Sequence, residues 1–175
     1  MMQNEANAVS YRAHLQQQIH VGRRTLIGMI VMTVVNLGFL LGDGDTYLLF
    51  SASVPYYLTW FGKAMDNGLG SSLWQENGVY TMTGLVVSLI MLAVYLLPWF
   101  LSKKKGSWLW MAFALFCLDL LALLGVALLV GLGAVVADLL IHIVLLYQIG
   151  KGAASYKKLK NLPPDITFTV ITEEG

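Results

Sequence analysis

The sequence predicts an all-α membrane protein: a four-transmembrane-helix bundle with an extracytoplasmic aromatic helix, re-entrant or interfacial, between spans 1 and 2. First, 57% of the 175 residues are hydrophobic and 12% are charged, with a mean hydropathy of +0.68. Soluble domains are roughly half apolar and about a quarter charged. Second, four apolar runs are long enough to cross a hydrocarbon core of about 30 Å. Third, the basic residues gather where four spans would leave them on one side.

The first 24 residues are polar and are expected to precede the membrane. Within them Tyr11, Leu15 and Ile19 recur every four residues and would share one helical face. This pattern predicts a cytoplasmic amphipathic segment, residues 1–24, that enters the membrane after Arg23 and Arg24. A signal peptide is the alternative. The long polar leader and the length of the next apolar run argue against it.

Residues 25–150 are expected to form one transmembrane domain. The first run is short for a span, since about 17–25 residues are needed to cross. Lysines follow the second run, and Gly131-Leu132-Gly133 joins the third to the fourth. The predicted spans are about 25–41, 79–101, 108–130 and 134–149.

The stretch 47–61 is aromatic and apolar but is interrupted by Ser51, Ser53 and Pro55. It has about 15 residues, which is too few for a span and suits a re-entrant or surface element. Tyr and Trp concentrate at headgroup level, which agrees with either form. The sequence leaves the choice between them open. The polar stretch 63–77 is predicted to be a surface loop.

The distribution of basic residues predicts the orientation. With four spans, ten of the eleven Lys and Arg residues lie on one side and only Lys63 on the other. A fifth span at 47–61 would separate residues 103–105 from Arg23 and Arg24. We therefore expect a multi-pass cell-membrane protein with both termini cytoplasmic and a basic tail, residues 151–175. Anionic lipid headgroups are expected at Lys103, Lys104, Lys105, Lys157, Lys158 and Lys160.

Three ionisable residues, Asp119, Asp138 and His142, fall inside the last two spans. Each costs roughly 2.5–3.5 kcal/mol at a bilayer centre, so such groups face the bundle interior. Counted from Leu132, Asp119 is 13 residues back and His142 is 10 residues on. At 1.5 Å per residue the two differ by only about 4.5 Å in height. A buried polar cluster is predicted, made of Asp119, Asp138, His142, Asn36 and Ser88.

Three functions are compatible with this cluster. It could handle protons or cations in a small transport or channel-like protein, or in a subunit of one. It could be a structural Asp–His clamp in a non-catalytic scaffold or sensor. A membrane-embedded enzyme is the third reading. Because four short helices rarely enclose a large pathway, transport implies a homo-oligomer or a larger membrane partner besides the lipid bilayer.

No catalytic residue, cofactor or nucleic-acid partner is predicted. The chain has no HExxH, GxSxG or Walker A motif, and its net charge is +1. Asp138 and His142 have metal-compatible helical spacing, but catalytic zinc takes three protein ligands and only one histidine lies in a span. Ser51 and Ser53 could act as nucleophiles, yet the sequence places no base beside them.

The order of these features resembles that of small uncharacterised four-span integral membrane proteins of bacteria. Arg23-Arg24 precedes a first span that contains Asn36, and the aromatic stretch 50–57 follows. The last helix carries Asp138-x-x-x-His142 and ends in lysines. The resemblance implies a protein of the bacterial cell inner membrane and implies no activity.

Overall fold

The computed structural model describes residues 2–42, 44, 46–69 and 78–162. These residues form five α-helices and one π-helical turn, and no strand occurs among them. Four helices are long and apolar enough to cross a membrane, which confirms the all-α prediction and indicates a multi-pass membrane protein. The elements are α1 (Met2–Leu41), α2 (Ser53–Ala64), η1 (Met65–Leu69), α3 (Val79–Ser102), α4 (Trp108–Val130) and α5 (Leu132–Lys160).

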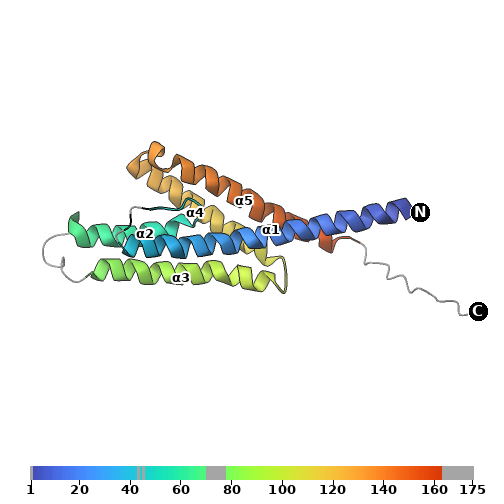
Figure 1. Cartoon of the computed structure of the whole chain (residues 1–175), viewed down its shortest axis with the longest axis horizontal. Coiled ribbons are helices and arrows are strands. Elements are labelled where there is room, and N and C mark those ends of the chain that lie inside the picture. The colour runs from blue at the N-terminus through green and yellow to red at the C-terminus, as the bar shows by residue number, and fades with distance from the viewer. Residues whose placement is uncertain (1, 43, 45, 70–77, 163–175) are drawn as a thin grey trace, which may run out of the picture.

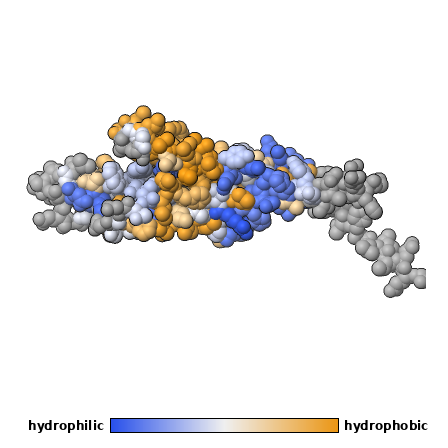
Figure 2. All heavy atoms as spheres, turned by 45° about the horizontal axis from the view of Figure 1, so that its top comes forward, coloured by the Kyte–Doolittle hydropathy of each residue, from blue (hydrophilic) through white to orange (hydrophobic). Residues whose placement is uncertain are grey.

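The helices form an elongated bundle with two distinct ends (Figure 1). At the terminal end, α1 begins, α5 finishes and residues 103–107 join α3 to α4. At the opposite end, here the hairpin end, α1 finishes at Leu41 and Gly131 joins α4 to α5. α1 packs along α5, α2 along α3, and α4 along α5. Figure 2 shows a hydrophobic band across the middle with hydrophilic surface on both sides, as a bilayer requires.

Two helices are longer than predicted. α1 runs unbroken from Met2 into the first span, and α5 continues to Lys160 rather than stopping near residue 149. The two extensions pack on each other: Leu15 and Ile19 are buried, and Ser155 donates to the Gln18 side chain. Each extension covers an apolar face that water would otherwise contact. Residues 163–175 of the predicted tail lie outside the described residues.

The predicted loop at residues 63–77 is wrong for its first part, because residues 63–69 are helical. η1 ends near Gly68, which has a φ of 126°. Asp66 accepts hydrogen bonds from the backbone N–H groups of Tyr80 and Thr81 and from the Thr81 hydroxyl. This carboxylate therefore supplies acceptors for the first turn of α3, whose N-cap residue Gly78 has no side chain. The rest of the predicted loop, 70–77, lies outside the described residues.

α2 and α3 approach each other closely at two glycines. A Cβ atom at Gly84 would lie 2.5 Å from the carbonyl oxygen of Leu58, and one at Gly62 would meet the backbone of Tyr80. Only glycine permits such backbone contact between helices. Ser88 adds a hydrogen bond to the Pro55 carbonyl oxygen. α2 is thus fixed along α3, and this packing determines where its N-terminus points.

Replacing Gly84 by alanine is expected to lower the free energy of unfolding by about 1–3 kcal/mol, the usual cost of overpacking. Gly125→Ala is the matched control, because a Cβ atom there meets nothing within 4 Å. Thermal unfolding in detergent should show a lower midpoint for Gly84→Ala and no loss for Gly125→Ala. Equal midpoints would contradict the close α2–α3 packing.

The capping role of Asp66 predicts an acid-dependent stability. The Thr81 hydroxyl bond, followed by the two backbone bonds, lowers the pKa of Asp66 below its usual 3.8. A carboxylate with a lowered pKa in the folded state stabilises that state above its ordinary pKa, and the contribution is lost as pH falls through the lowered value. Asp66→Asn should therefore be less stable than the wild type at neutral pH, with the difference shrinking in acid. A difference that is constant with pH would refute the role.

Candidate functional site

α2 begins deep inside the bundle, where its first backbone N–H groups meet Asp119. The N–H of Ser53 donates to Asp119 Oδ2 and that of Val54 to Oδ1, both at 2.9 Å. The N-cap residue, Ala52, offers no side-chain acceptor. A carboxylate near the midpoint of α4 therefore caps a different helix, and its negative charge faces the positive end of the α2 dipole.

His142 bridges the two carboxylates. Its Nε2 lies 2.9 Å from Asp119 Oδ2. Its Nδ1 lies 2.8 Å from the backbone carbonyl of Asp138 and 3.3 Å from Asp138 Oδ1. A carbonyl oxygen can only accept, so Nδ1 carries a hydrogen and the shared proton of the site lies between Nε2 and Asp119. The ring stacks on Phe116, with centroids 4.9 Å apart and planes 4° from parallel.

Three hydroxyl groups complete the cluster. Tyr95 donates to Asp119 Oδ1 at 3.1 Å, while Tyr47 and Ser53 donate to Asp138 Oδ2 at 2.9 and 3.1 Å. Asp138 Oδ1 makes no hydrogen bond within the described part of the chain and lies 3.3 Å from His142 Nδ1. We call this set the Asp–His network; its members are Tyr47, Ser53, Tyr95, Asp119, Asp138 and His142.

The network is closed to solvent at its centre. Asp119 and His142 are 0% exposed and Asp138 is 2% exposed. Tyr95 is the one partner with a sequence signal, since it shares a helical face with Gly84 and Ser88 in the second span. Tyr47 and Ser53 lie in the aromatic stretch. The periodicity of a single helix does not reveal where that stretch lies relative to the spans.

Asn36 joins the network through the segment before α2. Its amide donates to the Leu48 carbonyl and to the Ser51 hydroxyl, and it accepts from the Leu48 N–H, each at 2.8 Å. Ser51 in turn lies 3.4 Å from the Tyr47 hydroxyl. Thr33 accepts from the Ala52 N–H at 2.7 Å. Side chains of α1 therefore satisfy a non-helical backbone segment that lies within the bundle.

Ser88 lies apart from the network. It donates to the Pro55 carbonyl and sits 2.9 Å from the Thr59 hydroxyl. The structure thus brings four of the five predicted cluster residues into one hydrogen-bonded system and gives Ser88 a packing contact between α2 and α3. The six predicted headgroup lysines are exposed, and Lys103 lies 3.8 Å above the Trp99 ring. Their contact with lipid stays a prediction.

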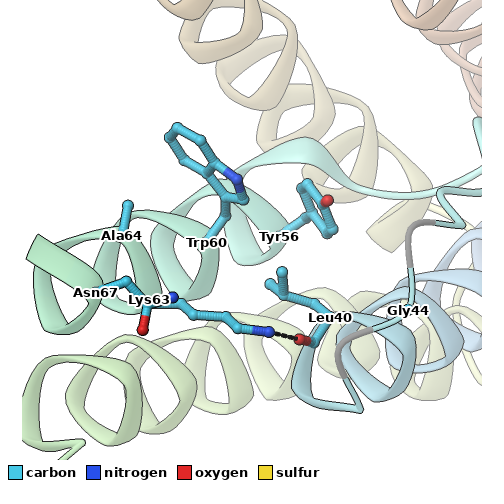
Figure 3. A pocket seen from close by; sticks show the side chains of 7 residues that line it. All are labelled: Leu40, Gly44, Tyr56, Trp60, Lys63, Ala64 and Asn67. Carbon is cyan, nitrogen blue, oxygen red and sulfur yellow. Dashed lines mark hydrogen bonds between the residues drawn. The ribbon is translucent and has the colours of Figure 1, made fainter.

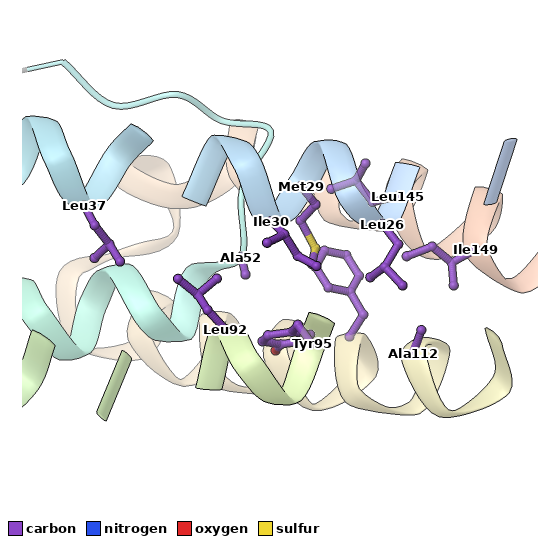
Figure 4. Close-up of a cluster of buried hydrophobic side chains, with 11 residues drawn as sticks. Leu26, Met29, Ile30, Leu37, Ala52, Leu92, Tyr95, Ala112, Leu145 and Ile149 are labelled. Atoms are coloured by element: carbon purple, nitrogen blue, oxygen red, sulfur yellow. The ribbon is translucent and has the colours of Figure 1, made fainter. Parts of the chain in front are cut away.

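The two sides of the network differ. Toward the terminal end it meets an apolar core, part of which Figure 4 shows, that includes Leu26, Met29, Phe116, Leu145 and Ile149. Toward the hairpin end it meets polar and aromatic groups. The Tyr47 ring lies 4.6 Å from that of Tyr56, which borders a cavity of about 430 Å³ together with Leu40, Trp60 and Lys63 (Figure 3).

Tyr47 is the link between the network and this cavity. Burial, and next the charge of Asp138, raises the pKa of the Tyr47 hydroxyl above its usual 10.0. The hydroxyl therefore keeps its proton and donates to Asp138 at ordinary pH. Through Tyr47 and Tyr56 the network connects to the hairpin-end cavity, whereas apolar packing closes its other side.

The expectation that no base lies beside Ser53 is wrong, because His142 Nε2 is 3.1 Å from its hydroxyl oxygen. The arrangement is nonetheless poor for nucleophilic catalysis. The Ser53 proton points to Asp138, Nε2 faces Asp119, and the adjacent backbone N–H groups that could bind an oxyanion are held by Asp119. Among the described residues, no group of three His, Cys, Asp or Glu side chains is arranged to hold a metal ion.

Comparisons with protein-family models, with curated proteins and with solved structures gave no match for this chain. The resemblance to small bacterial four-span proteins therefore adds no activity.

Asp119→Asn should destabilise the protein by about 1–3 kcal/mol, the cost of leaving a buried donor without an acceptor. The amide NH₂ group of Asn would face donors on Ser53 or Val54 that the carboxylate now accepts. Tyr95→Phe removes a single hydroxyl donor and should cost only about 1 kcal/mol. Denaturation in detergent checks both values. An Asn variant as stable as the wild type would contradict the capping role of Asp119.

Proposed function

We propose that this protein is a small membrane transport protein, or a subunit of one, that takes up protons at the Asp–His network. The observation that carries the proposal is the bridging of two buried carboxylates by one imidazole, with Asp138 Oδ1 left without a hydrogen bond in the described part of the chain. With both carboxylates ionised and His142 protonated, the network has one net negative charge. A low-dielectric interior disfavours that charge, so the network favours one additional proton or cation.

The charge distribution supports an orientation with the terminal end in the cytoplasm. That end holds the arginines of α1, the lysines at 103–105 and those that finish α5. The positive-inside rule then puts both termini in the cytoplasm and the hairpin end outside, in a bacterial inner membrane. In this orientation residues 47–52 enter from the outside and α2 returns, a re-entrant element. Its backbone groups need internal partners at membrane depth, and Thr33, Asn36 and Asp119 provide them.

Proton uptake follows the polar side of the network. A proton enters from the hairpin-end cavity past Tyr47 and reaches Asp138. His142 gives its Nε2 proton to Asp119, and the Ser53 hydroxyl, 3.1 Å from both Asp138 Oδ2 and Nε2, takes the proton of Asp138 and passes its own to Nε2. Once protonated, Asp119 loses the charge that attracts the N–H groups of Ser53 and Val54, so the hold on α2 weakens. The titratable groups that contact Asp119 are His142 from α5 and Tyr95 from α3, and His142 in turn contacts Asp138. Passage of the proton to the cytoplasm then requires an opening in the apolar core between Phe116 and the terminal end.

Four short helices leave little room for a pathway of their own, so the proposal includes a homo-oligomer or a larger membrane partner. A second function has a specific observation in its favour. The complete burial of Asp119 and His142 also suits a structural clamp in a scaffold or sensor. Such a clamp would contribute stability and no proton movement.

Purified protein in liposomes that contain a pH-sensitive dye separates these two functions. We expect acidification of the lumen after an external acid pulse, and its loss in Asp119→Asn and His142→Gln. Tyr47→Phe should slow the flux roughly 100-fold, as expected when a positioned proton donor is removed. Tyr147→Phe, on the exposed face of α5, is the matched control and should behave as wild type.

A wild-type flux no greater than that of empty liposomes would overturn the transport proposal. If Asp119→Asn then lost only stability, the clamp would be the better explanation. A flux that survives in both Asp119→Asn and His142→Gln would show that protons move by another route.

A further inference from the structure

A groove of about 350 Å³ lies between α2 and the second half of α4. Its walls are apolar side chains apart from the hydroxyls of Ser53 and Tyr57. The α2 wall includes Val54, Leu58 and Phe61, and the α4 wall includes Ala122, Val126 and Leu129. It therefore contrasts with the cavity of Figure 3, which lies around Lys63 and Asn67 on the other side of α2.

The groove is open because the α4–α5 hairpin leans away from α2 near its tip (Figure 1). Leu128 and Leu129, at the end of α4, are 89% and 86% exposed. This part of α4 belongs to a candidate membrane span, so the medium at its level is hydrocarbon. An apolar hollow excludes water and accepts an apolar guest. Lipid acyl chains are the apolar groups available there.

We infer that the groove binds one acyl chain of a bilayer phospholipid. Trp60 borders both the groove and the cavity at the hairpin end. A chain in the groove would place its polar headgroup at the level of Trp60 and Lys63, where indole and ammonium groups favour a membrane–water interface. The shape and chemistry of the two hollows thus fit an amphiphile that enters sideways from the bilayer.

The inner end of the groove is Ser53, the residue that contacts both carboxylates of the network. A chain that fills the groove rests on α2, the helix that Asp119 holds by its N-terminus. Occupancy of the groove and the protonation state of the Asp–His network are therefore linked through the position of α2. On this basis the transported substrate is a phospholipid-like amphiphile; this last step rests on the proposed function, whereas the binding site itself does not.

The test uses the full chain with Trp60 as its single tryptophan, the other four (Trp74, Trp99, Trp108 and Trp110) being replaced by Phe. Phosphatidylcholine with dibrominated chains, which quench indole fluorescence, is titrated into the protein in detergent. A neutral headgroup is chosen so that binding reports on the chain. We expect saturable quenching with one lipid per protein and competition by unbrominated phosphatidylcholine. Native mass spectrometry of the unmodified chain should show the same single lipid.

Val126→Phe fills the groove and should weaken binding about tenfold, equivalent to losing the burial of roughly two methylene groups. Leu121→Phe is the control, because Leu121 is 62% exposed on the same helix and does not line the groove. Quenching that rises without saturation, or equal binding in the two variants, would overturn the inference. If no lipid bound while the proton flux stayed intact, only the lipid-binding inference would be refuted. If lipid bound saturably but the protein carried no proton flux, only the transport proposal would be refuted.

Discussion

A helix that begins inside an apolar bundle must find acceptors for its first backbone N–H groups, and this constraint organises the structure. Water cannot serve them at that depth, and Ala52 at the start of α2 has no polar side chain. Asp119 serves them from α4. Its charge in turn needs the donors that His142 and Tyr95 provide. The polar centre of the bundle is thus the consequence of placing the α2 N-terminus there.

The same arrangement gives α2 two unlike sides. Toward α3, Gly62 and Gly84 bring the backbones into contact and leave no space. Toward α4, α2 packs through Tyr57 but leaves an apolar groove beside this contact. α2 is thus fixed along one side, borders a groove on the other and is held at its N-terminus by a carboxylate. This pairing connects the proposed proton chemistry with the proposed lipid site.

Sequence reasoning predicted the four long apolar helices, since length and hydropathy decide them, and the closeness in height of Asp119 and His142, since the hairpin fixes both depths. It did not predict that α2 starts at Ser53 between those groups. Hydropathy indicates that the apolar stretch 47–61 is too short to cross a membrane. It does not indicate which helices of the bundle the backbone of this stretch contacts. Nor did sequence reasoning predict the long α1. A polar N-terminal segment with one apolar stripe is compatible both with a separate amphipathic helix and with an extension of the first span. Tyr95 could be placed on a polar helical face, whereas Tyr47 lies between α1 and α2, outside any helix, and has no helical period that would place it.

Infrared difference spectroscopy of the membrane-embedded protein, recorded between neutral and acidic pH, can detect protonation of the buried carboxylates. Proton storage in the Asp–His network predicts a carboxylic-acid C=O band that grows on acidification, has the high frequency of a dry environment and changes in both Asp119→Asn and Asp138→Asn. A band unaffected by either substitution, or no buried-acid band across the pH range in which the protein stays folded, would contradict proton storage. The network would then be a fixed support for α2.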